Sequence, residues 1–298
     1  MKKLLCLSLL VVSVGGIVLC AAHIVPYVQE EMQSASLYAE LAAIHTAGNE
    51  TDGEGMTTTS GLSTLCALMT ESGDDAENSP VDGETPENGE GNSQNESLEE
   101  TSGPTSPPVI HSGLLKLHQR NPDCVAWITI EGTPIDYPVM YRPGQKNYYL
   151  HRDFNGRRVS AGALFIAEIC DPDTSDNVII YGHHMNSGKM FAALNKYKKQ
   201  SFYEEHSRIV YETLNGTEIY EVIFAFTTPV YTGHDFQYYA FSKANSAEEY
   251  DDYISACRSR SRYDTGKTAQ YGDKLLTLST CEYSQKNGRM VVVAKKIT

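Results

Sequence analysis

The chain has 298 residues and a formal net charge of −14, from 38 Asp and Glu against 24 Lys and Arg. The acidity is local, because 17 of the acidic residues lie within residues 27–110, where no Lys or Arg occurs. Residues 111–298 are therefore near neutral, and they carry no basic patch with interleaved aromatic side chains, which argues against nucleic-acid binding.

An apolar run of 22 residues, 4–25, follows Lys2 and Lys3, and His23 is its only ionisable side chain apart from two thiols. About 20 apolar residues cross the hydrocarbon core of a bilayer, and basic residues ahead of the span favour a cytoplasmic N-terminus. The sequence therefore predicts that residues 1–25 form a single-pass membrane anchor, with the rest of the chain outside the cell. A cleaved signal peptide and a lipoprotein signal on Cys20 stay open as alternatives.

Residues 26–109 form a second region with little to bury. Leu37, Leu41 and Ile44 recur at helical intervals, which predicts a short juxtamembrane helix over residues 26–46. Residues 47–108 are rich in Gly, Ser, Thr, Asn, Pro and acids, a composition typical of a disordered spacer. We expect its repelling charges to extend it and to separate the folded domain from the membrane.

The folded domain is predicted over residues 110–298, where short apolar runs alternate with turn residues such as Asn215-Gly216 and Asn287-Gly288. Helices are expected at 111–120, 189–197 and 247–260. Because helices do not alternate with strands, the pattern favours a mainly β barrel or sandwich with a few peripheral helices. Eight strands are expected: residues 125–130, 135–139, 163–167, 178–181, 208–213, 218–226, 274–280 and 290–296.

Seven cysteines occur without a CxxC pair or zinc-site spacing, so we expect neither a metal nor another cofactor. An odd number leaves at least one thiol unpaired, as an inert buried side chain or as a nucleophile. Cys281 is the candidate nucleophile, because it ends the strand-like run KLLTLST and backbone N–H groups beside it are free to bind an oxyanion.

Two histidines and one arginine are candidate partners of this thiol. His183 and His184 follow the strand-like run NVIIY and Gly182, which we expect to allow a sharp turn, and an imidazole can carry a proton near neutral pH. Spacing does not choose between them. Arg289 lies beyond the predicted turn at residues 287–288, so a hairpin would bring it close to Cys281, where a guanidinium lowers a thiol pKa or stabilises an oxyanion.

Six ordered segments resemble motifs of class B sortases, and the likeness covers essentially all of residues 111–298. The first segment contains the family's histidine, the next two its cysteine and arginine, and the last three resemble its opening strands. The segments are YGHHMNSGKMFAALNKY (181–197), LSTCEY (278–283), NGRMVVVAKK (287–296), NPDCVAWITIEGTPIDYPVM (121–140), YYLHRDFNG (148–156) and SAGALF (160–165).

The resemblance implies an eight-stranded sortase barrel, in which residues 247–260 match the extra class B helix between strands 6 and 7. It assigns the catalytic roles to Cys281, His183 and Arg289, since the family's histidine directly follows Gly. By position within the motifs, it assigns substrate contacts to four further residues, Leu150, Ser279, Thr280 and Glu282. Cys124 departs from the apolar residue usual in the family, and we interpret it as a core substitution.

The implied activity is that of a cysteine transpeptidase that cleaves an NPxTx- or SPxTx-like C-terminal sorting signal of secreted proteins. A thioacyl intermediate would then be joined to an amine of peptidoglycan. Two alternatives stay open: a cysteine endopeptidase that trims surface proteins without transfer, and a tethered binding module that has kept the barrel.

Overall fold

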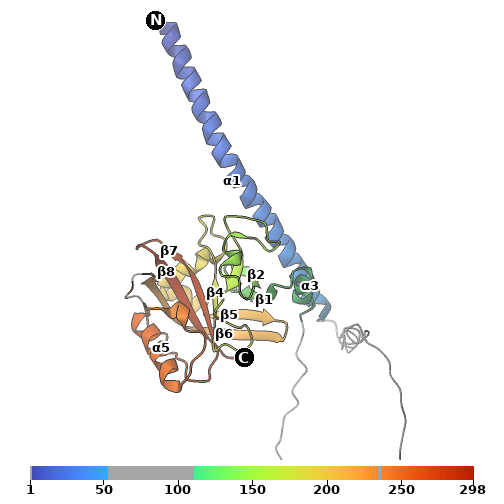
Figure 1. Ribbon diagram of the computed structural model, residues 1–298, viewed down its shortest axis with the longest axis vertical. Coiled ribbons are helices and arrows are strands. Elements are labelled where there is room, and N and C mark those ends of the chain that lie inside the picture. The colour runs from blue at the N-terminus through green and yellow to red at the C-terminus, as the bar shows by residue number, and fades with distance from the viewer. Residues whose placement is uncertain (1, 53–110, 232, 234–235) are drawn as a thin grey trace, which may run out of the picture. The chain divides into compact units, whose positions relative to one another are not determined.

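The computed structural model of the protein describes residues 2–52, 111–231, 233 and 236–298 (Figure 1). Within the first helix, it describes the side chains of residue 22 and residues 24–48. Nearly all of the predicted spacer and most of the predicted anchor side chains therefore lie outside the described residues.

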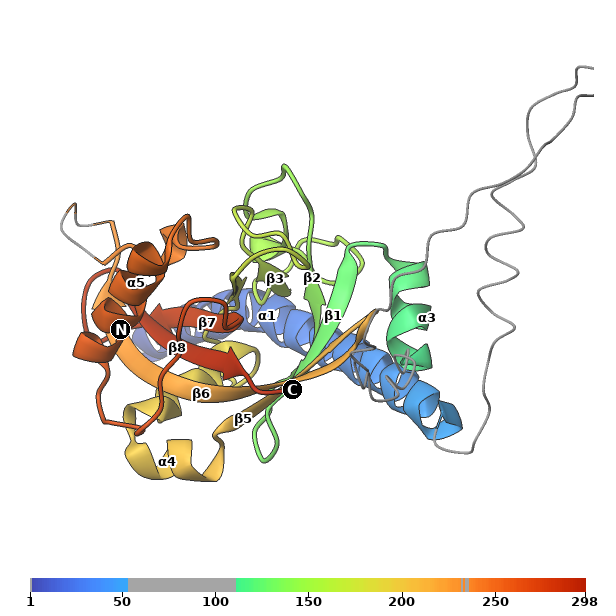
Figure 2. The same ribbon diagram turned by 90° about the horizontal axis from the view of Figure 1, so that it is seen from below.

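A closed β-barrel forms the body of the domain, with the strands in the order β1-β2-β3-β4-β7-β8-β6-β5 (Figure 2). The pairs β2–β3 and β4–β7 are parallel and the other pairs are antiparallel. All eight predicted strands are present, so the predicted eight-stranded barrel is confirmed. The strands are β1 Cys124–Thr129, β2 Asp136–Met140, β3 Leu164–Ile166, β4 Asn177–Tyr181, β5 Arg208–Thr213, β6 Gly216–Pro229, β7 Leu275–Glu282 and β8 Gly288–Lys296.

Helices surround the barrel, and α5 is the predicted helix at 247–260, lying between β6 and β7 as the resemblance implies. Its N-cap Ser246 accepts a hydrogen bond from the amide of Glu249, and acidic side chains fill its first turn. The helix predicted at residues 189–197 is present as the 3₁₀ helix η2. Three further short helices, η1, α4 and η3, were not predicted. The elements are α3 Ser112–Arg120, α4 Gln200–Glu205, α5 Ala247–Arg260, η1 Tyr148–His151, η2 Phe191–Lys198 and η3 Tyr238–Ala240.

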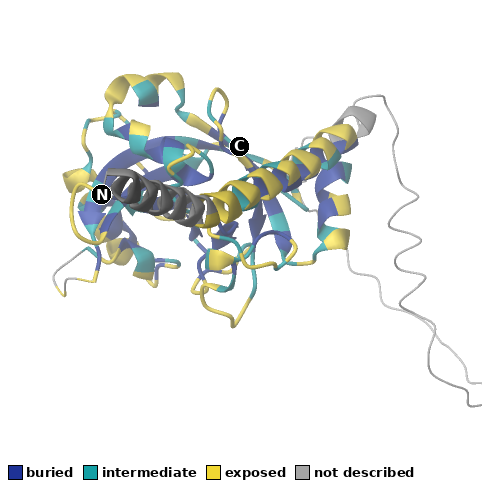
Figure 3. Cartoon of the chain, turned by 90° about the horizontal axis from the view of Figure 1, so that it is seen from above, coloured by how far each residue is buried: buried dark blue, intermediate teal, exposed yellow. Residues whose placement is uncertain are grey.

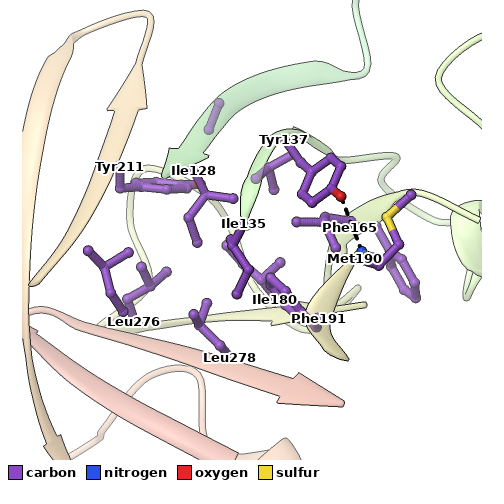
Figure 4. Close-up of a cluster of buried hydrophobic side chains, with 14 of the residues drawn as sticks. Ile128, Ile135, Tyr137, Phe165, Ile180, Met190, Phe191, Tyr211, Leu276 and Leu278 are labelled. Carbon is purple, nitrogen blue, oxygen red and sulfur yellow. Dashed lines mark hydrogen bonds between the residues drawn. The ribbon is translucent and has the colours of Figure 1, made fainter. Parts of the chain in front are cut away.

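Strands β7 and β8 separate two apolar cores, because successive side chains on a strand point to opposite faces. Leu276 and Leu278 point into the barrel, where Figure 4 shows them among other buried apolar side chains. Leu275, Val291 and Val293 point outward and are covered by α5 and its flanking loops. The outward-facing side of β7 and β8 is therefore buried along most of the two strands. Only the ends of these strands remain open for a functional site.

The first helix, α1 (Lys2–Asp52), runs through Pro26 and packs on the domain with its C-terminal part. Its buried side chains form one stripe at helical spacing: Ser34, Leu37, Tyr38, Leu41 and His45. The predicted helix over residues 26–46 is present as part of the longer α1, and its place next to a membrane stays a prediction. Figure 3 shows the opposite side of this part of the helix exposed. Each buried leucine contributes on the order of 1.5–3 kcal/mol, which favours stable docking.

No helix among the described residues combines the length and apolar character of a membrane span. The predicted anchor over residues 4–25 falls almost wholly on side chains outside the description, so it stays a prediction.

The end of α1 lies beside the start of α3. The hydroxyl of Ser112 donates to the carbonyl oxygen of Gly48 at 2.7 Å, although 64 residues separate them in the sequence. Helix α1 therefore contacts the folded domain directly. The predicted spacer lies almost wholly outside the described residues, so it stays a prediction.

Candidate active site

Cys281 lies near the end of β7, directly opposite Arg289 in the antiparallel ladder with β8. The Cβ atoms of such facing residues lie about 4.5–5.5 Å apart, and their side chains share one face of the sheet. Cys281 is half-buried, whereas Leu275 on the same face of β7 is covered by the outer core. The predicted hairpin is present, and it places Cys281 and Arg289 opposite each other on one face of the sheet. The guanidinium of Arg289 donates to the carbonyl oxygen of Gly288 at 2.9 Å.

His183 reaches the same place from β4, which runs parallel to β7. Tyr181 is paired with Ser279, and the amide of Gly182 donates to the carbonyl oxygen of Ser279 at 3.2 Å. His183 follows Tyr181 by two residues, as Cys281 follows Ser279, so the register at the end of β4 places the two residues at the same level. Three strand ends thus supply an imidazole, a thiol and a guanidinium to one edge of the barrel.

Gly182 is required by packing and not by an unusual backbone angle. A Cβ at this position would lie 2.7 Å from the ring of Phe191 and would also contact Leu164. Its φ is outside the left-handed region, so the expected sharp turn is not the reason for glycine here. The missing side chain instead lets Leu164 of β3 and Phe191 of η2 pack closely against the residue that precedes His183.

A backbone carbonyl fixes the orientation of the His183 ring. Nε2 lies 2.7 Å from the carbonyl oxygen of Leu150, and because a carbonyl only accepts, Nε2 carries the hydrogen. In the neutral ring, Nδ1 is then the nitrogen free to accept a proton. Burial lowers the pKa of His183, and the nearby His151 and Arg289 lower it further, against the opposing effect of the Leu150 carbonyl. The neutral ring is therefore favoured at neutral pH.

His184 contacts the backbone of Cys281 and not its thiol. Its Nδ1 lies 3.2 Å from the carbonyl oxygen of Cys281, and the side-chain amide of Asn195 approaches both groups, at 2.7 Å and 3.2 Å. The ring also packs against Tyr283, with centroids 5.3 Å apart. Asn195 was missed from the sequence, where the only signal was its position inside the histidine-containing segment.

Two of the four predicted substrate contacts border the candidate catalytic side chains, Leu150 through its carbonyl and Ser279 from the same face of β7 as Cys281. Leu150 is half-buried and supplies the carbonyl that binds His183. Ser279 is buried, and its hydroxyl lies 2.7 Å from the hydroxyl of Tyr238. Both residues border the candidate catalytic side chains.

Thr280 and Glu282 point to the opposite face of β7. Thr280 is buried, and its hydroxyl has no hydrogen-bond partner among the described residues. The buried carboxylate of Glu282 forms an ion pair of 2.5 Å with Lys198 and accepts hydrogen bonds from Ser284. Although burial alone raises the pKa of Glu282, these partners hold it below the ordinary value.

Exposed tyrosines occur in the loops of this part of the domain, and Tyr283 lies next to Cys281. Tyr283 is 69% exposed, and its pKa is raised by partial burial and by the neighbouring Cys281, while Arg289 opposes the shift. Tyr231 is 75% exposed and packs against Tyr239, with ring centroids 6.1 Å apart. The place of Tyr283 beside Cys281 was not predicted.

The four cysteines of the domain differ in burial and therefore in how readily their thiols can react. Cys124, Cys170 and Cys257 are buried, and burial raises the pKa of their thiols to about 12, 11 and 12, respectively. The interpretation of Cys124 as a core residue is confirmed. Cys281 is the one described cysteine that is only half-buried, which makes it the accessible thiol of the domain.

Comparison with known families decides the relationship, because residues 128–297 match the sortase domain. The chain belongs to the sortase family. This sortase is 36% identical over 194 residues to sortase B of Listeria monocytogenes, covering 63% of its own chain and 76% of that relative. It therefore has the cysteine transpeptidase fold and activity of that family.

Solved structures agree with the class B relationship. The sortase resembles a Staphylococcus aureus sortase B–substrate complex with a TM-score of 0.58 and 30% identity, over 63% of this chain and 86% of that one. It resembles a sortase B in complex with triglycine with a TM-score of 0.57 and 30% identity, over 62% and 86% of the two chains.

Proposed function

We propose that Cys281 attacks the Thr carbonyl of an NPxTx- or SPxTx-like sorting signal at the C-terminus of secreted proteins, and that the enzyme joins the resulting acyl group to a peptidoglycan amine. The observation that carries this proposal is the pairing of Cys281 with Arg289 across β7–β8, with His183 two residues beyond the end of the adjacent strand β4. The substrate and triglycine complexes of related sortases B support a peptide donor and an amine acceptor.

In the first half of the reaction, the sulfur of Cys281 bonds to the carbonyl carbon and its proton passes to Nδ1 of His183. The guanidinium of Arg289 and a backbone N–H near Glu282 stabilise the oxyanion. The C–N bond then breaks, and His183 returns the proton to the departing amine, which leaves a thioester on Cys281.

In the second half, the acceptor amine attacks the thioester carbon and its proton passes to His183. The C–S bond breaks, the thiolate of Cys281 recovers the proton, and a new amide bond remains. A neutral His183 suits both halves, because each begins with the ring as a base. Leu150 and Ser279 are positioned to contact the donor peptide on the Cys281 side, and contacts from Thr280 and Glu282 involve the backbone of β7.

We extend the proposal to the location of the enzyme. Residues 1–25 anchor it as a single-pass membrane protein with a cytoplasmic N-terminus, residues 26–109 lead outside the cell, and residues 110–298 are the extracellular catalytic domain. The apolar run with Lys2 and Lys3 ahead of it supports this arrangement. A cysteine-labelling reagent that does not cross membranes should therefore modify Cys281 in intact cells, and labelling only after lysis would contradict it.

The activity is tested by incubating the enzyme with an NPxTx peptide and triglycine, followed by mass spectrometry. We expect a ligated product from the wild type and none from Cys281→Ala. Formation of the free acid alone would favour the endopeptidase, and continued ligation by Cys281→Ala would refute the assignment of the nucleophile.

A further inference from the structure

Helix α1 contacts both of the chain segments that surround His183. One segment is the loop from His184 to Met190, which directly follows the histidine. The other is the turn at residues 160–162, which packs against the carbonyl that binds the His183 ring. Neither contact belongs to the barrel, and each is made by a side chain that precedes the predicted domain boundary at residue 110.

Glu31 binds the loop after His183. Its carboxylate forms an ion pair of 2.9 Å with Lys189 and lies 3.4 Å from the hydroxyl of Ser187, and its own carbonyl oxygen accepts from Lys189 at 3.2 Å. The loop is closed by a backbone bridge between His184 and Met190. The ion pair therefore connects α1 to a loop whose two ends lie next to the histidine.

The end of this loop is strained, so it depends on its neighbours. Met190 has φ 54° and ψ −131°, a conformation that costs a non-glycine residue roughly 1–3 kcal/mol. Its amide donates to the hydroxyl of Tyr137 at 3.3 Å (Figure 4), and Tyr137 packs edge-on against Tyr38 of α1, with centroids 5.3 Å apart. The next amide, of Phe191, donates to the carbonyl oxygen of His183 at 3.0 Å.

Tyr38 also binds the second segment. Its buried hydroxyl donates to the carbonyl oxygen of Gly162 at 2.9 Å. Gly162 packs so closely on the backbone that a Cβ there would contact the carbonyl oxygen of Leu150, the acceptor of the His183 ring. A shift of Gly162 would therefore move the atom that orients the imidazole.

We propose that Glu31 and Tyr38 of α1 are positioning residues for His183, so that the helix preceding the barrel sets the orientation of the catalytic imidazole. The inference rests on the proposed role of His183. Its physical basis is that a strained loop and a tightly packed turn keep one geometry only while their outer contacts are present. Misplacement of a reacting group by about 1 Å can cost on the order of 100-fold in rate.

The test uses the full chain in detergent micelles with ¹³C-labelled histidine. The variants Glu31→Gln and Tyr38→Phe remove one polar contact each, and the His183 signal is assigned by its loss in His183→Gln. Because loosening the loop admits water to the ring, we expect its titration midpoint to shift upward and kcat for transfer to fall about three- to tenfold with little change in KM. The charged or titratable groups facing this ring are His151, Arg289 and Cys281, which the variants leave in place.

Matched controls separate positioning from simple loss of stability. Glu40→Gln removes an ion pair of the same helix with Arg120, away from the histidine loop, and Tyr27→Phe removes an exposed hydroxyl of the same helix. Both should keep the wild-type midpoint and kcat. The double variant Glu31→Lys with Lys189→Glu should recover both quantities, because it restores the ion pair with exchanged charges.

An unchanged midpoint and kcat in Glu31→Gln and Tyr38→Phe would overturn the inference, as would equal changes in the Glu40→Gln control. If Tyr38→Phe does not fold, Glu31→Gln with its charge-exchanged double variant still decides the matter. The titration needs no substrate, so an incorrect donor peptide would abolish transfer in the wild type without affecting this readout.

Discussion

Lys198 of η2 forms an ion pair with the buried carboxylate of Glu282, the residue that follows Cys281 in β7. The carboxylate is only 3% exposed and the lysine 30% exposed, so removal of the lysine leaves a charge inside the protein without its main partner. We expect Lys198→Met to lower the free energy of unfolding at pH 7 by about 1–3 kcal/mol.

The loss of stability in Lys198→Met should become smaller at acidic pH. The pKa of Glu282 is lowered in the folded protein, so its stabilisation is present above the ordinary carboxyl pKa and is lost as pH falls through the folded value. The difference between wild type and Lys198→Met in denaturant unfolding should therefore persist from pH 7 to about pH 5 and shrink as the pH falls below the ordinary carboxyl pKa of 4.5. The exposed neighbour Lys199→Met is the control, and an equal loss there would contradict the prediction.

His183 should also make the domain less stable on acidification, but at a higher pH than Glu282 does. Its pKa is lowered by burial, so the unfolded chain binds the proton more tightly than the folded protein. This contribution is complete above the unfolded pKa of about 6.5 and declines as pH falls below it. In urea titrations at pH 7.5 and 5.5, His183→Gln should lose less stability on acidification than the wild type, and an equal loss in both proteins would contradict the assignment.

Asn195→Ala should reduce turnover without removing a group that touches substrate. The amide of Asn195 contacts His184 and the Cys281 carbonyl, so its loss frees the backbone that carries the thiol. We expect kcat to fall about tenfold with KM within about twofold, as measured in the peptide–triglycine assay. The exposed amide variant Gln200→Ala should behave as wild type. A rise in KM alone would show that Asn195 acts in substrate binding instead.

Gly182→Ala should destabilise the protein by about 1–3 kcal/mol, because the added methyl group meets the side chain of Leu164 and the ring of Phe191. The combination with Phe191→Leu should recover part of that loss, since the smaller side chain makes room for the methyl group. A double-mutant cycle in urea measures this coupling, and strict additivity of the two changes would show that the methyl group is accommodated elsewhere.

Local patterns were sufficient to predict most of the barrel. Alternating apolar residues and turn dipeptides mark strands within a few residues, and the hairpin around Asn287, at φ 55°, is a short-range feature that places Arg289 opposite Cys281. The helix at Leu37 and Leu41 was predicted for the same reason, because its spacing repeats within two turns.

The sequence by itself determined the eight strands, the family relationship and the candidate catalytic side chains. The tertiary structure alone decided that α1 docks on the domain, that Glu31 meets Lys189, 158 residues away, and that Asn195 contacts the backbone of Cys281. The physical reason is that strand and turn signals arise between near neighbours, whereas contacts between distant segments depend on how the closed barrel and its loops bring their surfaces together.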